Sequence, residues 1–87
     1  MTDKPDLMAH IQFTDTFGGE PNYGWVRNAE VRVQWPYNNS VVVRRCKKAL
    51  GLKARHKLVD AGCDLTLRFP GSHTIAFITF KEATNNG

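Results

Sequence analysis

The sequence lacks the features that mark membrane-spanning or disulfide-stabilised proteins. Its apolar runs stay well short of the roughly 18 residues of a membrane span, and its first residues lack the basic-then-apolar pattern of a signal peptide. It holds two cysteines, Cys46 and Cys63, in 87 residues, which fits a reducing compartment better than a disulfide scaffold. We therefore expect a cytoplasmic protein with no membrane partner.

The sequence also has few signals of a metal site, a nucleotide cofactor or a catalytic centre. A structural zinc site needs about four ligands, and the cysteines and histidines here show no paired spacing. Segment 16–25 contains several glycines, but no Lys-Ser or Lys-Thr pair follows them as in a phosphate-binding loop. Asp15, Glu20 and Asp60 could serve acid–base chemistry, although turn formation is the commoner role of such loop carboxylates. We therefore expect no metal, no cofactor and no catalytic residue.

Length and composition predict one small globular domain. A chain of 87 residues has room for a single modest core, and 41% apolar with 23% charged residues is ordinary for a folded protein. The polar ends predict flexible tails at residues 1–7 and 82–87, with the domain at 8–81.

Alternation of apolar and polar residues predicts strands on both sides of one helix. Strands are expected from residue 9, from residue 25 up to Pro36, at 64–69 and at 74–80, with the last in the centre of the sheet because it is apolar on both faces. Breakers at 18–24 predict a long loop. The predicted inward-facing strand residues are Ala9, Ile11, Phe13, Ala29, Val31, Val33, Trp35, Leu65, Leu67 and Phe69.

The helix is expected to start at residues 38–40 and to end near Gly51, a common residue after a helix. Its apolar arc comprises Val42, Val43, Cys46, Ala49 and Leu50. Segment 52–58 could extend the helix, but it also alternates, and we favour a strand. The prediction is an α+β domain of order β-β-α-β-β-β, in which one helix packs on a mainly antiparallel sheet of about five strands.

A basic run is the feature that points to a partner. Between Ser40 and Leu58 there is no acidic residue, and the seven cations are Arg44, Arg45, Lys47, Lys48, Lys53, Arg55 and Lys57. Clustered Lys and Arg attract polyanions, although cations on a solvated face explain the run equally well. The two periodicities predict two surfaces, one on the helix and one on the uncovered sheet face.

The uncovered face is expected to carry Lys53, Arg55 and Lys57 with Arg32 and Arg68, and Phe80 as its main aromatic residue. The complete set of candidate nucleic-acid-binding residues is Arg32, Arg44, Arg45, Lys48, Lys53, Arg55, Lys57 and Arg68. An acidic protein surface is the alternative partner, and an edge strand of the sheet could pair across a dimer.

Segment 16–25 is a candidate protein interface because it gathers aromatic residues between glycines. The candidate interface residues are Phe17, Glu20, Tyr23 and Trp25. The alternative, which we prefer, is a hairpin loop whose aromatic residues fold back over the edge of the core.

Residues 14–20 (TDTFGGE), followed by Asn22-Tyr23 and by residues 25–27 (WVR), resemble a family of small proteins from bacteriophages, prophages and plasmids. A basic helix ending ALGL at 49–52 and a late Phe77-Ile78 strand agree with it. The resemblance implies an accessory protein of a mobile element in a bacterial cytoplasm, and it assigns no activity and no functional residue.

The first functional hypothesis is a non-enzymatic protein that binds nucleic acid through a basic surface. The alternative is a protein-binding inhibitor of a bacterial defence system, of which anti-CRISPR proteins are one class. A small enzyme is the least favoured interpretation, because it would need a deep pocket lined by a carboxylate or a histidine.

Overall fold

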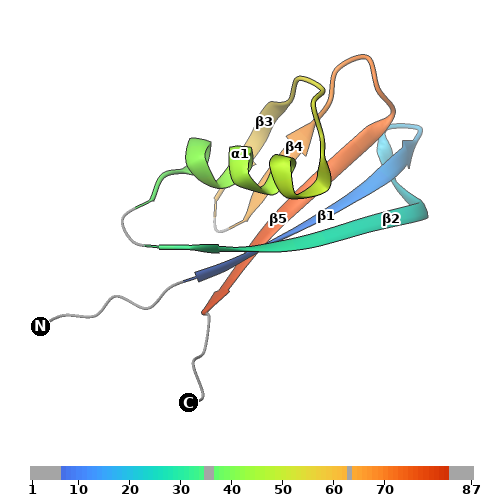
Figure 1. The fold of residues 1–87 in the computed structure, drawn as a ribbon. Coiled ribbons are helices and arrows are strands. Elements are labelled where there is room, and N and C mark those ends of the chain that lie inside the picture. The colour runs from blue at the N-terminus through green and yellow to red at the C-terminus, as the bar shows by residue number, and fades with distance from the viewer. Residues whose placement is uncertain (1–6, 35–36, 63, 83–87) are drawn as a thin grey trace, which may run out of the picture.

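One helix lies across one face of a five-stranded antiparallel sheet (Figure 1). The computed structural model describes residues 7–34, 37–62 and 64–82. The elements are β1 (Leu7–Phe17), β2 (Glu20–Val33), α1 (Asn39–Leu50), β3 (Lys57–Ala61), β4 (Leu65–Arg68) and β5 (Thr74–Glu82). The strands lie in the order β2-β1-β5-β4-β3, so the predicted α+β class, element order and central position of the last strand are confirmed.

The ends of the domain extend slightly further than predicted. Leu7 and Glu82, which were assigned to tails, lie opposite each other in β1 and β5. The rest of both predicted tails, and also Trp35, Pro36 and Cys63, lies outside the described residues.

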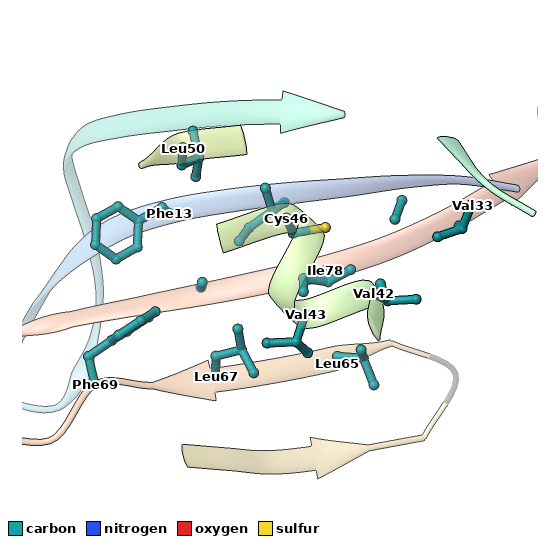
Figure 2. Packing of buried hydrophobic residues seen from close by; sticks show 13 residues of the cluster. Phe13, Val33, Val42, Val43, Cys46, Leu50, Leu65, Leu67, Phe69 and Ile78 are labelled. Atoms are coloured by element: carbon teal, nitrogen blue, oxygen red, sulfur yellow. The ribbon is translucent and has the colours of Figure 1, made fainter. Parts of the chain in front are cut away.

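The core forms between α1 and the central strands, as the alternation predicts. Figure 2 shows Val42, Val43 and Cys46 of the helix facing Leu65 and Ile78 of the sheet. Asn38 caps the helix, because its Oδ1 accepts a hydrogen bond of 2.9 Å from the amide of Val41. Ala49, predicted in the apolar arc, is exposed, since it lies at the edge of that arc.

Phe80 of β5 lies on the face opposite to the one predicted. Phe80 lies opposite Ala9 on the helix side, and its ring stacks on Tyr37 at a centroid distance of 6.4 Å. Phe77 lies opposite Gln12 and Thr66 on the uncovered face. The prediction that Phe80 lies on that face was therefore wrong. Alternate residues of a strand share a face, and Phe80 shares the helix side with Ala76 and Ile78.

The predicted long loop at 18–24 is a tight turn followed by a bulged strand. Gly18 and Gly19 have φ of 64° and 84°, the positive values of a type I′ hairpin turn. Thr14 pairs with Val26 and Thr16 with Pro21. Asp15 alone therefore faces four residues of β2, and this is a large β-bulge.

The Asp15 carboxylate holds this bulge together. Asn22 Nδ2 donates to Asp15 Oδ2 and the amide of Gly24 donates to Oδ1, both at 2.8 Å. The backbone of Gly24 lies close to this carboxylate, because a Cβ built at position 24 would lie 3.0 Å from Asp15 Oδ2 and would force it to shift by a few tenths of an ångström. The hydrogen bond from Asn22, above all, lowers the pKa of Asp15 below its ordinary value of 3.8, and the bond from Gly24 adds to this. The geometry therefore favours a structural role for Asp15 over acid–base chemistry.

Protonation of Asp15 is expected to loosen the bulge. Because its pKa is lower in the folded chain than in the unfolded chain, the stabilisation is present above the ordinary value of 3.8 and is lost as the pH falls through the lower, folded value. The amide chemical shift of Gly24, followed by NMR between neutral pH and pH of about 2, is expected to titrate in this acidic range. In an Asp15→Asn variant the same shift is expected to be flat, and a titration that persists in the variant would refute this role.

Candidate nucleic-acid interface

A groove of about 580 Å³ runs along one side of α1, between the helix and the segment that follows it. We call it the helix groove, and its lining comprises Ser40, Arg44, Lys47, Lys48, Gly51, Leu52, Lys53 and His56. The lining residues of α1 recur at intervals of three and four, so they share one side of the helix. The helix groove is therefore a continuous feature along the length of α1.

The chain reverses at the end of α1 and returns along the helix. Gly51 has φ of 71°, its amide donates to Lys48 O at 3.1 Å, and the amide of Leu52 donates to Lys47 O at 2.8 Å. These two bonds are a Schellman motif, which satisfies the last carbonyl groups of the helix. Leu52 packs against the core as the accompanying apolar contact.

Lys47 ties the returning segment to the helix. Its Nζ donates to Ala54 O at 2.6 Å and lies 3.0 Å from His56 Nδ1. Burial, and then the neighbouring Lys47 ammonium, lower the pKa of His56 below its ordinary value of 6.5. His56 is therefore neutral at pH 7, and Nδ1 accepts from Lys47, because an ammonium group can only donate.

The strand predicted from residue 52 was wrong, as was its alternative, an extended helix. Residues 52–56 belong to neither element, and β3 begins at Lys57. Lys53 and Arg55 are therefore not members of a strand on the uncovered face. Lys53 instead lines the helix groove beside Arg44 and Lys48, whereas Arg55 is exposed outside that lining.

Every charged residue that lines the helix groove is positive. Of the described residues, no Asp or Glu lines it. Arg44, Lys48 and Lys53 form no ion pair within residues 7–34, 37–62 and 64–82. Arg45, the remaining cation of α1, is exposed. It is rotated by about 100° around the helix axis from Arg44 and does not line the groove. The structure thus brings together three of the predicted residues and adds Lys47.

Gly51 determines the path of this segment, and the effect of its replacement on the free energy of unfolding can be predicted. No atom lies within 4 Å of a Cβ built at Gly51, so Gly51→Ala changes only the strain of a positive φ. We expect it to lower the free energy of unfolding by roughly 1–2 kcal/mol in urea denaturation. Gly62→Ala is the matched control, because its Cβ would meet Asp60 at an ordinary 3.8 Å. Equal effects of the two substitutions would contradict this explanation.

The uncovered sheet face carries cations at both ends but no continuous basic surface. Lys57 and Arg68 are direct cross-strand partners at one end. At the other end, Arg32 and Lys81 both lie opposite Met8 of β1. The first pair is in register with Thr14 of β1. Thr14 lies six residues from Met8, so the two pairs are about 20 Å apart. Near the second end, Glu30 Oε2 lies 3.3 Å from both Lys81 Nζ and His10 Nδ1. This offsets part of the local positive charge.

The hairpin end exposes the aromatic residues of the predicted protein interface. Phe17 is 80% exposed, Tyr23 53% and Trp25 43%, and Glu20 is also exposed. The centroid of the Trp25 ring lies 5.2 Å from that of the Phe13 ring, so Trp25 folds back onto the edge of the core. Phe17 is left to the solvent.

Cys46 does not have the properties of a nucleophile. It is completely buried, and burial raises the pKa of its thiol to about 11, so it stays protonated at neutral pH. Elsewhere in the described chain, no three His, Cys, Asp or Glu side chains gather in a way that could hold a metal. No described helix has the length and apolar character needed to span a membrane.

Comparison of the chain with protein-family models, with curated proteins and with solved structures finds no match in any of the three. The function is therefore inferred from the residues of the helix groove and their arrangement.

Proposed function

We propose that this protein binds nucleic acid without enzymatic activity, by placing backbone phosphates in the helix groove. The observation that carries the proposal is the union of Arg44, Lys47, Lys48 and Lys53 around one groove that no described acidic residue lines. Phosphate neutralisation by such cations supplies most of the affinity of non-specific nucleic-acid binding. The resemblance of residues 14–27 to phage, prophage and plasmid proteins supports a role as a mobile-element accessory protein in a bacterial cytoplasm.

The cations of the helix groove have different roles in this proposal. Lys47 Nζ already donates to the backbone within the protein, so it shapes the groove and contributes charge. Arg44, Lys48 and Lys53 are the direct phosphate contacts. No described Phe, Tyr or Trp lines the groove, and base stacking on these large aromatic rings therefore does not contribute. Binding that depends on phosphate contacts and not on base edges carries little sequence preference.

Titration of a labelled DNA duplex with the protein at several salt concentrations tests the proposal. Three phosphate contacts predict a slope of about −2.7 for the logarithm of the binding constant against the logarithm of the salt concentration. The affinity then falls about 40-fold between about 50 and 200 mM salt. Binding that is absent at low salt, or that does not change with salt, would exclude this function.

A second candidate function is supported by the exposed hairpin end. Phe17 and Tyr23 offer aromatic anchors of the kind that dominate protein interfaces, which fits an inhibitor of a bacterial defence complex. Capture of partners from a bacterial lysate, repeated after nuclease treatment, separates the two functions. Loss of all partners with nuclease favours nucleic-acid binding. A protein partner that survives nuclease and is lost in a Phe17→Ala variant favours the inhibitor.

A further inference from the structure

A second groove, of about 390 Å³, lies at the end of the sheet where three segments meet. The start of β3, the turn between β4 and β5, and the turn between β1 and β2 all contribute to it. Figure 1 shows both turns at the same end of the sheet. We call it the strand-end groove. Its volume is within the range of sites for small ligands, and it shares no lining residue with the helix groove.

Two positive side chains lie side by side at this groove. Lys57 and Arg68 are direct cross-strand partners in β3 and β4, and both line the strand-end groove. Directly opposed side chains have Cβ atoms about 5 Å apart, and like charges in this arrangement are unfavourable. Neither forms an ion pair within the described part of the chain. An anion between them would turn this repulsion into two attractive contacts.

The remaining polar groups of the groove can donate hydrogen bonds to an anion. Thr16, Ser72 and Thr74 bring hydroxyl groups and His73 brings an imidazole ring, and no described carboxylate lines the groove. Ser72 Oγ lies 3.0 Å from Thr74 Oγ1. The backbone holds these groups in place, because the amide of Thr16 donates to His73 O at 2.9 Å and that of Ser72 donates to Phe69 O at 3.0 Å.

We infer that the strand-end groove binds a phosphoryl group between Lys57 and Arg68. The planar guanidinium group of Arg68 can donate two parallel hydrogen bonds to phosphate oxygens, and Lys57 adds a point charge. Ser72 and Thr74 share one hydrogen bond, and the hydroxyl group that accepts in it donates its own proton to a remaining phosphate oxygen. The inference is independent of the proposed function of the helix groove, because it uses other residues. A free phosphate monoester and a nucleic-acid phosphodiester share this chemistry.

NMR titration of the ¹⁵N-labelled protein with inorganic phosphate, at constant ionic strength, tests the site. Saturable shifts are expected for the amides of Lys57, Arg68, Ser72 and His73. Arg68→Gln is expected to weaken this binding about tenfold or more, because it removes charge-assisted hydrogen bonds. Arg45→Gln is the matched control, since Arg45 is exposed and lines neither groove, and it is expected to leave the binding unchanged.

Two outcomes would overturn the site. Either the phosphate shifts at the four amides fail to saturate, or Arg68→Gln binds phosphate as the unsubstituted chain does. A folded spectrum of Arg68→Gln, expected because Arg68 is exposed, excludes unfolding as the cause of its lost binding.

A nucleoside monophosphate and a dinucleotide without terminal phosphate distinguish the two sources of the phosphoryl group. Tighter binding of the monophosphate assigns the strand-end groove to free phosphorylated ligands, and tighter binding of the dinucleotide assigns it to nucleic acid. Failure of both to shift the four amides would refute the inference. Charge reversal at Arg44 and Lys48 is expected to leave these shifts unchanged, so the two grooves are tested separately.

Discussion

Replacement of both Arg44 and Lys48 by glutamate is expected to weaken nucleic-acid binding at about 50 mM salt by about 100-fold or more. Both side chains line the helix groove, and neither forms an ion pair within the described residues. Each substitution removes a charge-assisted contact and places a negative charge against the phosphates. Fluorescence anisotropy with a labelled duplex measures the change.

Arg45→Glu is the control for this experiment, and it is matched in charge to Arg44→Glu or Lys48→Glu alone. It reverses a charge on the same exposed helix, one residue from Arg44, but outside the lining of the helix groove. We expect a much smaller loss of affinity, through the general field of the protein alone. Equal losses for Arg45→Glu and for either groove substitution alone would show that net charge, and not the groove, determines binding.

Ile78→Ala is expected to lower the free energy of unfolding by about 2–5 kcal/mol. Ile78 is completely buried and lies in β5 between Ile11 and Leu65, beneath α1 (Figure 2). Its truncation removes apolar contacts and leaves a cavity in the layer that joins the helix to the sheet. Because an 87-residue domain has a total stability of only about 4–13 kcal/mol, urea denaturation resolves the loss easily.

Thr79→Ala provides the comparison on the other side of the same strand. Thr79 is exposed on the uncovered face, so its replacement is expected to change the free energy of unfolding by no more than about 0.5 kcal/mol. Similar effects at positions 78 and 79 would contradict the placement of the core between α1 and the sheet.

The architecture could be predicted because apolar periodicity and chain breakers agreed over most of the chain. The alternation at Ala9, Ile11 and Phe13 corresponds to three buried residues of β1. Gly51 marks the end of the helix, where its left-handed conformation closes the last turn. Such local signals determine which face of an element is buried.

The path of residues 52–58 could not be predicted, because a strand and a segment that folds back along a helix can show the same alternation of apolar and polar residues. Leu52 is half-buried through the Schellman motif and not through a strand. The Lys47 side chain then holds the carbonyl of Ala54, a long side-chain contact that leaves no periodic signal. Because of this error, Lys53 was predicted on the wrong surface, and the cations of one groove were assigned to two separate patches.

The hairpin was mistaken for a loop for a related reason. Glycine and proline at 18–24 break regular strands, but a single carboxylate, that of Asp15, replaces the missing ladder contacts of the bulge. The spacing of Asp15, Asn22 and Gly24 has no meaning until the strands are paired. Side-chain hydrogen bonds of this kind depend on the register of the hairpin.

The most direct test of the helix groove is the salt dependence of nucleic-acid binding in a Lys53→Gln variant. Lys53 was predicted on the sheet, and the structure places it in the groove. If it contacts a phosphate, its loss reduces the magnitude of the logarithmic salt slope by about 0.9, while Arg45→Gln leaves the slope unchanged. A slope that is the same in the Lys53→Gln variant and in the unsubstituted chain would contradict nucleic-acid binding in the helix groove.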